Sequence, residues 1–285
     1  MSSSDLKRLQ LLGLGVMLLV FGGCFRRYFL SEKDIAKFYE THGPAPVYHS
    51  YDTLGHRVFY ASVNEQRTDL PLLILVHGSP GGWWVYLNML TDPRLLERFR
   101  MISVDRPGFG KSDLQRRRVS LEETTNLLSP LVRKGGEAGC YLLGRSYGGP
   151  VVAKLAAQQQ ERVKGLVLLS SASSPKLEKF WWFSKPADRP PIRWFLGKPV
   201  RRASDEKFAH VEELERMLPV WAQITAPTVV MHGGNDWIVD TANGAFMDRE
   251  LVHAPHRLIR LPGVGHRISN EAPDRVVEVL LELLH

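Results

Sequence analysis

The sequence has little cysteine: its 285 residues include only Cys24 and Cys140, and they contain no internal repeat and no low-complexity tract. Cys140 opens an apolar run, so we expect a small buried side chain and no disulfide, and cysteine usage does not indicate a redox compartment. The histidines show no metal-ligand spacing, and no nucleic-acid recognition motif accompanies the net charge of +7. The sequence therefore predicts neither a metal site nor a nucleic-acid partner, and its length allows one large α/β domain or two small ones.

Positive charge is concentrated in two segments of the chain. Residues 1–30 carry a net charge of +3, and residues 176–202 carry eight Lys or Arg against only Glu178 and Asp188, a net charge of +6. Two interpretations stay open for these segments. They form solvated basic surfaces, or they are attracted to an anionic membrane or an anionic substrate.

The N-terminal segment has the pattern of a secretion signal or a membrane anchor. Residues 11–21 are apolar or glycine throughout and follow a basic pair, which is the length of a signal-peptide core and short for a membrane span. The run ends in Phe21-Gly22-Gly23-Cys24, which resembles a bacterial lipoprotein cleavage box. A lipid-modified Cys24, an uncleaved anchor within residues 1–30 and a buried soluble helix stay open. The first two place the protein at a membrane, on its periplasmic or other extracytoplasmic face.

Beyond the N-terminal segment, short apolar runs alternate with segments of helical spacing. This alternation predicts strands joined by crossover helices, and hence a mostly parallel sheet. The predicted strands are residues 47–51, 57–63, 72–76, 101–104, 140–143, 166–169, 228–231 and 258–261. The predicted helices are residues 121–133, 150–160 and 273–284. Residues 174–221 break this rhythm.

The motif Gly144-Arg145-Ser146-Tyr147-Gly148 has the form G-x-S-x-G. It stands between a predicted strand and a predicted helix, the context in which such a turn exposes a serine hydroxyl. A serine hydroxyl is a weak nucleophile that needs both exposure and a base. We therefore predict that Ser146 is the nucleophile of a serine hydrolase. The alternative is a glycine-rich turn with a solvent-facing serine.

Two further candidate residues follow the last two predicted strands. Asp236 and His266 complete the chain order Ser, Asp, His. The carboxyl ends of parallel strands meet at one edge of a sheet, where catalytic residues collect. We expect His266 to accept the proton of Ser146, and Asp236 to fix the tautomer of His266 and stabilise its imidazolium. Asp240 is the alternative acid.

A glycine-rich turn, His77-Gly78-Ser79-Pro80-Gly81-Gly82, follows the strand predicted at residues 72–76. Such a turn points backbone N–H groups at one spot, which an acyl-transfer enzyme needs for its developing oxyanion. The predicted donors are the N–H groups of Ser79 and Tyr147. The His77 side chain is expected to be structural.

The sequence Gly110-Lys111-Ser112 resembles the end of a phosphate-binding loop. The glycine that must open such a loop would stand at Asp105, and Pro107 removes one N–H donor. Nucleotide binding is therefore not predicted.

Taken together, these residues resemble the α/β-hydrolase superfamily over about residues 45–285. The match rests on His77-Gly78, the segment 105–112, the Ser146 turn, Asp236 and His266. The resemblance implies an α/β fold with an eight-stranded, mostly parallel sheet flanked by helices, a helical cap after the sixth strand, and no cofactor. Haloalkane dehalogenases and epoxide hydrolases of this superfamily carry an aspartate at the nucleophile position, and the serine here argues against both. The glycine-rich turn is also similar to that of proline iminopeptidases, whose longer acidic cap is not matched.

Residues 174–221 are the predicted cap, inserted in a hydrolase domain of residues 31–285. They contain aromatic residues at 181–183, 194 and 195, which either form an apolar acyl or aryl pocket or pack the cap and touch a membrane. The predicted function is membrane-tethered hydrolysis of a small-molecule carboxylic ester of short or medium acyl length. An amidase, thioesterase or aminopeptidase with the same triad stays open, as does a non-catalytic binding protein of the hydrolase fold.

Overall fold

The computed structural model describes residues 30–113, 120–182 and 184–285. The chain divides into two compact units, Met1–Gly43 and Pro44–His285. In the first unit the described part contains helix α2 (Glu32–Tyr39), whose N-terminus is a capping box: the Asp34 N–H donates to Ser31 Oγ, and the Ser31 N–H donates to the Asp34 carboxylate. The predicted signal or anchor, with Cys24, lies outside the described residues, and the predicted boundary at residue 30 stays a prediction.

Within the described ranges, no helix combines the length and the apolar character that crossing a bilayer requires.

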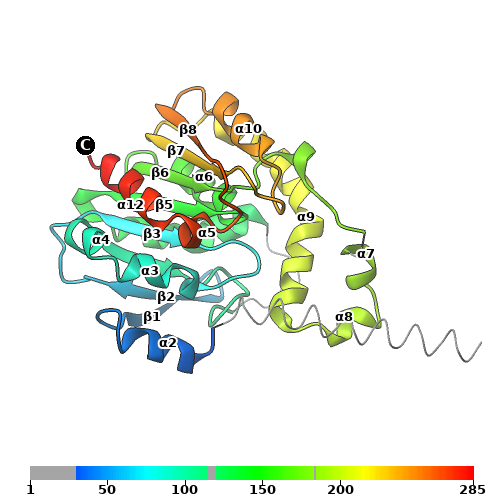
Figure 1. Cartoon of the computed structure of the whole chain (residues 1–285), viewed down its shortest axis with the longest axis horizontal. Coiled ribbons are helices and arrows are strands. Elements are labelled where there is room, and N and C mark those ends of the chain that lie inside the picture. Colours follow the sequence, from blue (N-terminus) through cyan, green and yellow to red (C-terminus); the bar gives the residue numbers. More distant parts are fainter. Residues whose placement is uncertain (1–29, 114–119, 183) are drawn as a thin grey trace, which may run out of the picture. The chain divides into compact units, whose positions relative to one another are not determined.

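The second unit is built on a sheet in which the described residues form eight strands, in the order β1-β2-β4-β3-β5-β6-β7-β8 (Figure 1). The β1–β2 and β2–β4 pairs are antiparallel, and all other neighbours are parallel. The predicted eight-stranded, mostly parallel sheet is confirmed. The strands are β1 (Val47–Thr53), β2 (His56–Val63), β3 (Leu72–Val76), β4 (Arg100–Val104), β5 (Cys140–Arg145), β6 (Val163–Leu169), β7 (Thr228–Gly233) and β8 (His256–Leu261).

Helices cover the sheet on both faces. The main core cluster joins the sheet to α5, α6, α9 and α10, while α12 contacts α3 and α4 (Figure 1). The helices of this unit are α3 (Leu87–Leu90), α4 (Pro93–Arg98), α5 (Leu121–Arg133), α6 (Gly148–Gln158), α7 (Ser184–Ala187), α8 (Ile192–Phe195), α9 (Lys198–Trp221), α10 (Ala242–Glu250), α11 (Ile268–Glu271) and α12 (Pro273–Glu282). Short 3₁₀ helices are η1 (Trp83–Tyr86), η2 (Gly136–Ala138) and η3 (Pro175–Leu177).

The central strands explain why the sheet forms where it does. Every residue of β3, β5 and β7 is buried, as expected of strands with helices on both faces. The turn around Gly55, at φ 77°, lets β1 and β2 pair as an antiparallel hairpin. All eight predicted strands and all three predicted helices form, with ends shifted by a few residues.

The segment between β6 and β7 is more regular than its sequence indicated. It contains η3, α7 and α8, followed by α9, a helix of 24 residues. The inward face of α9 buries Leu214, Met217 and Trp221 near its C-terminal end. Its N-terminal half buries charged side chains instead, which removes the apolar periodicity from which a helix is predicted.

Candidate active site

Ser146 lies on a sharp turn between β5 and α6. Its φ of 55° is in the left-handed region, which is uncommon for a residue with a side chain. The turn is fixed from both sides, since the Ser146 N–H donates to the Leu169 carbonyl at 2.9 Å and the Ser146 carbonyl accepts from the Gly149 N–H at 3.0 Å. The side chain is half-buried. A strained residue held this firmly, at the end of a central strand, is typical of a functional position.

The glycines of the turn are required by close backbone approaches. A Cβ on Gly148 would lie 2.4 Å from the Val76 carbonyl oxygen, and one on Gly144 would lie 2.4 Å from the carbonyl oxygen of Gly148. A Cβ on Gly78 would lie 3.0 Å from the Cβ of Ser146. The glycine-rich turn after β3 therefore passes directly beside the Ser146 side chain.

Asp236 and His266 are joined by a hydrogen bond at the ends of adjacent strands. His266 Nδ1 lies 2.8 Å from Asp236 Oδ2. The other carboxylate oxygen accepts the N–H groups of Ile238 and Val239, both at 2.9 Å. Burial favours the neutral carboxyl, but the contacts with His232 and His266 and the backbone hydrogen bonds outweigh it and hold the pKa of Asp236 well below its usual range. Asp236 is therefore an anion that orients the His266 ring.

A second histidine contacts the same carboxylate. His232, the fifth residue of β7, is buried and places its Nε2 3.4 Å from Asp236 Oδ2. No sequence motif predicted a role for His232. The one sequence signal for its contact with the carboxylate was its position four residues before Asp236.

The alternative acid, Asp240, has another role. Its carboxylate accepts the Ala242 N–H at the start of α10, at 3.0 Å, and pairs with Lys179 at 3.2 Å. His266 contacts Asp236 rather than Asp240. Among the described residues, no hydrogen bond joins Ser146 Oγ to His266, a bond that often tightens only when substrate is bound.

The two predicted oxyanion donors flank Ser146. Tyr147 precedes α6, so its N–H is one of the helix's unsatisfied first donors. Neither the Tyr147 N–H nor the Ser79 N–H donates a hydrogen bond within the described parts of the chain. The Ser79 hydroxyl is also buried without a partner in those parts. Both amides therefore lack a hydrogen-bond acceptor in the described parts of the chain.

His77 is structural, as expected. Its Nε2 accepts the Arg106 N–H at 2.9 Å, so the proton is on Nδ1, which lies 2.6 Å from the Gly78 carbonyl oxygen. Burial, with Arg106 close by, lowers the pKa of His77 well below its usual value. The neutral ring fixes the turn that carries Ser79.

The segment 105–112 encloses a carboxylate rather than a phosphate. The N–H groups of Trp83 and Lys111 each donate to the Asp105 carboxylate at 2.8 Å. Ser112 donates its hydroxyl to the Asp105 carbonyl oxygen at 2.7 Å. Burial raises the pKa of Asp105 to about 6, despite these hydrogen bonds. The hydrogen-bond donors of Lys111 and Ser112 in this loop therefore bind Asp105 of the same loop.

Arg106 connects helix α9 to the Ser146 region. Its guanidinium donates to both carboxylate oxygens of Glu206 in α9, at 2.6 and 3.0 Å. The same group donates to the carbonyl oxygens of His77 and Gly78, and it stacks 4.4 Å from the ring centre of Tyr147. Both side chains of this ion pair are buried, so removal of either one would leave the charge of the other buried without a partner.

A second polar cluster also lies against the Tyr147 ring. The His210 ring stacks on the Tyr147 ring with centroids 4.7 Å apart. His210 Nδ1 lies 3.0 Å from Glu178 Oε2, and Lys207 pairs with the other oxygen of that carboxylate. Burial opposes ionisation, but the bonds from His210 and Lys207 lower the pKa of Glu178 to about 2. No sequence motif predicted a role for Glu178, Lys207 or His210.

The aromatic residues of the predicted cap are mostly at the surface. Trp182, Trp194 and Phe195 are largely exposed. Trp181 packs edge-on against Trp237, the residue that follows Asp236, with ring centroids 5.8 Å apart. Position 183 lies outside the described residues. Trp181 thus contacts the loop that carries Asp236.

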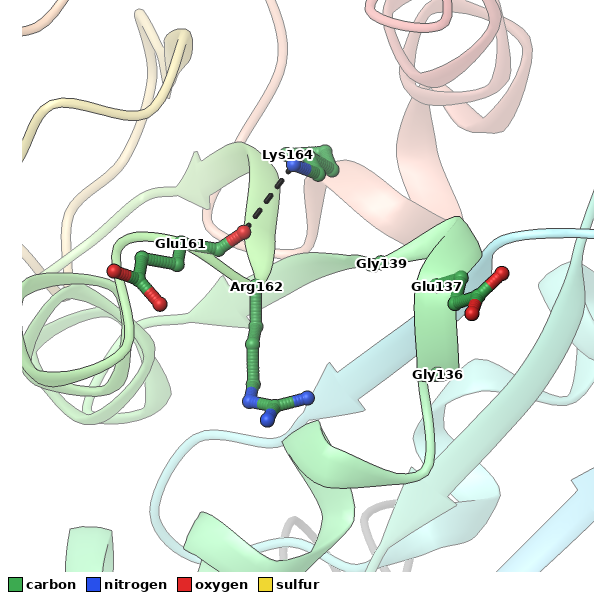
Figure 2. Close-up of a pocket in the computed structure, with 6 residues that line it drawn as sticks. All are labelled: Gly136, Glu137, Gly139, Glu161, Arg162 and Lys164. Atoms are coloured by element: carbon green, nitrogen blue, oxygen red, sulfur yellow. Dashed lines mark hydrogen bonds between the residues drawn. The ribbon is translucent and has the colours of Figure 1, made fainter.

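One surface depression lies far from these residues. Figure 2 shows it at the amino ends of β5 and β6, whereas Ser146 follows the carboxyl end of β5. Lys164 Nζ donates there to the Glu161 carbonyl oxygen at 3.2 Å. It is lined by Gly136, Glu137, Gly139, Glu161, Arg162 and Lys164. These residues include no candidate nucleophile, so the depression is separate from the candidate site.

Fold and site together define a hydrolase. A model of the Alpha/beta hydrolase family matches residues 73–279. The chain therefore belongs to the alpha/beta hydrolase family, as its sequence motifs indicated.

Individual relatives carry several different activities. Epoxide hydrolase 3 of Xenopus tropicalis is 24% identical over 281 residues, which cover 81% of this chain and 75% of that protein. Pimeloyl-[acyl-carrier protein] methyl ester esterase of Nitrosomonas europaea is 25% identical over 257 residues, covering 76% of this chain and 97% of that protein. The crystal structure of a membrane phospholipase A described as a novel bacterial virulence factor has a TM-score of 0.66 and 22% identity, over 98% of each chain. That likeness shows the fold.

Proposed function

We propose that the protein is a serine hydrolase that cleaves a carboxylic ester through an acyl-enzyme. Ser146 is the nucleophile, His266 the general base and Asp236 the orienting acid. One relationship carries the proposal: Ser146 stands on a strained turn after β5, and a histidine that is hydrogen-bonded to an ionised aspartate stands at the same edge of the sheet.

The chemistry follows from these positions. The Asp236 carboxylate accepts a hydrogen bond from His266 Nδ1–H and stays ionised, which leaves Nε2 free to take the proton from Ser146 Oγ as that oxygen attacks the ester carbonyl carbon. The N–H groups of Ser79 and Tyr147 stabilise the oxygen that becomes negative. The imidazolium then gives its proton to the leaving alcohol. Water attacks the acyl-enzyme by the same route and releases the carboxylic acid.

The residue at position 146 separates this proposal from some of the named relatives. An epoxide hydrolase or a dehalogenase of this superfamily attacks with an aspartate carboxylate, whereas the hydroxyl of Ser146 is suited to acyl transfer. The methyl ester esterase among the relatives supports an ester substrate. An amidase, thioesterase or aminopeptidase would use the same three residues.

We also propose that residues 174–221 form a cap beside the site and select a small-molecule acyl substrate. Three contacts with the residues around the site support this role. Glu206 and His210 of α9 contact Arg106 and Tyr147, and Trp181 contacts the residue after Asp236.

Hydrolysis of a panel of p-nitrophenyl esters of increasing chain length tests the ester proposal. We expect turnover at short or medium acyl length, and no turnover at any length would contradict the proposal. A mixed library of esters, thioesters and amides then identifies the scissile bond. Preference for thioesters or amides over every ester would replace the esterase assignment with one of the others.

Residues 1–30 are proposed to hold the enzyme at a membrane, on an extracytoplasmic face. Globomycin-sensitive processing, or acyl labelling that is lost in Cys24→Ser, would identify a lipoprotein. Retention in the membrane without either would identify an uncleaved anchor.

A further inference from the structure

Helix α8 and the segment just before α7 carry an unusual concentration of exposed aromatic rings. Trp182 is 81% exposed, and Trp194 and Phe195 are each 70% exposed. Large aromatic side chains are normally at least partly buried in a soluble domain, because they lose the most from contact with water. Together with two neighbouring rings they form what we call the aromatic surface: Phe180, Trp181, Trp182, Trp194 and Phe195.

The charges around the aromatic surface are of one sign. The two acidic residues of segment 176–202 are both used internally, since Glu178 binds Lys207 and His210, and Asp188 binds Arg193. Four exposed cations remain, for which the described residues provide no ion pair. They are Lys176, Lys185, Arg189 and Lys198.

The aromatic rings and the cations occupy the same outer elements. Figure 1 shows α7 and α8 on the far side of α9 from the sheet, so they do not cover the core. Lys185 and Arg189 lie in and just after α7, between the exposed rings in the sequence, and Lys176 and Lys198 flank those rings on either side. This pattern differs from that of an ordinary solvated basic surface, which lacks exposed rings.

We propose that the aromatic surface docks on an anionic lipid bilayer. Tryptophan is favoured at the level of the head groups, where its apolar ring is shielded and its N–H still meets polar partners. Lysine and arginine beside it gain attraction from anionic lipids. An acidic protein would satisfy the cations, but it would not give this many rings an apolar medium. The proposal goes beyond ester hydrolysis and does not depend on it.

Docking would also orient the candidate site. Trp181 belongs to the aromatic surface and packs against Trp237, which directly follows Asp236. The docked face therefore continues to the loop that carries the proposed acid. An enzyme held in this orientation would meet its substrate at the lipid surface.

Quenching of tryptophan fluorescence tests the proposal on the full chain. The protein is reconstituted in vesicles of acyl-brominated phosphatidylcholine, with or without phosphatidylglycerol. Residues 1–30 contain no tryptophan, so a membrane anchor in that segment contributes no signal of its own. We expect strong quenching in the anionic vesicles, weaker quenching in the neutral ones, and a decrease at high salt.

Charge variants separate docking from simple proximity. Lys185→Gln/Lys198→Gln keeps every tryptophan and should lose about half of the anionic quenching or more. A matched control removes two exposed cations elsewhere, as Arg98→Gln/Lys164→Gln, and should keep the quenching of the unaltered protein. Labelling of Ser146 by a fluorophosphonate confirms that each variant is folded.

Three results would overturn the proposal. The first is no quenching in either kind of vesicle. The second is equal loss of quenching in the Lys185→Gln/Lys198→Gln variant and its control. The third is a shift of tryptophan emission that depends on protein concentration without lipid, which would assign the surface to a second copy of the chain.

Discussion

A buried, bidentate ion pair joins Arg106, two residues after β4, to Glu206 in α9, although 100 residues separate them in the sequence. The pair joins the turn that carries Ser79 to the segment proposed as the cap. We predict that Glu206→Gln lowers the free energy of unfolding by about 3 kcal/mol, because it leaves the Arg106 charge buried and uncompensated. Urea denaturation measures this change.

A matched control exists on the outer face of the same helix. Glu212 pairs with Arg216 at the surface, so Glu212→Gln should change the free energy of unfolding by less than about 0.5 kcal/mol. Equal effects of the two substitutions would show that the Arg106–Glu206 pair does not fix α9.

Glu178 gives the protein a stability that depends on pH. Its pKa is lowered from 4.5 to about 2 by His210 and Lys207, although burial opposes this. A lowered pKa means that the unfolded chain binds the proton more tightly. The stabilisation is therefore complete above about pH 4.5 and is lost as the pH falls toward 2, with a total of about 3 kcal/mol. Unfolding free energies measured at several pH values should fall along this acid limb.

The variant Glu178→Gln isolates this contribution. It should be less stable than the unaltered protein at pH 7 and should show a flatter decline in acid. An unchanged acid limb in Glu178→Gln would assign the pH dependence to other carboxylates.

Gly78 is required by the space beside Ser146 rather than by its own backbone angles. The Cβ added by Gly78→Ala would lie 3.0 Å from the Ser146 Cβ and 3.5 Å from its Oγ. We expect kcat to fall on the order of 10²-fold, because the nucleophile or the oxyanion turn must shift. Gly197→Ala is the control, since its nearest new neighbour is 3.8 Å away. Comparable kcat values for the two variants would contradict the assignment of the turn.

Asp236→Asn tests the orientation of the catalytic base. An amide in place of the carboxylate no longer stabilises the imidazolium and favours the wrong His266 tautomer, so kcat should fall about 10⁴-fold. Asp240→Asn should keep most of the activity, because Asp240 binds the start of α10 and Lys179. If Asp240→Asn were the more damaging substitution, the acid would be misassigned.

Much of this molecule was predictable from local sequence. Continuous apolar runs identified the buried strands, since residues such as those of β3 have no other place in a folded chain. The left-handed turn at Ser146 was also predictable, because its neighbouring glycines match the close approaches that the fold imposes. Local patterns were sufficient wherever one residue's neighbours in sequence were also its neighbours in space.

The long helix α9 was not predicted, because its buried face is partly charged. Arg202, Glu206, His210 and Glu213 recur at helical spacing, yet polar residues at these positions normally indicate solvent. Their partners, such as Arg106 for Glu206, lie far away in sequence. Only the tertiary structure determines which of many carboxylates such a buried arginine meets.

For the same reason, neither the contact of His232 nor the exposure of the aromatic rings could be predicted from the sequence. The sequence places His232 in a strand, but its contact with the Asp236 carboxylate depends on how the chain bends after β7. Likewise, aromatic residues in the segment 174–221 are equally compatible with a closed pocket and an outer surface. The fold leaves Trp182, Trp194 and Phe195 on the outside.

Fluorophosphonate labelling, followed by mass spectrometry of the labelled peptide, tests the central claim most directly. The claim predicts one phosphonylated residue, Ser146, with labelling and ester turnover both abolished in Ser146→Ala and labelling slowed in Asp236→Asn. Labelling at another residue, or turnover by Ser146→Ala close to that of the unaltered protein, would contradict it.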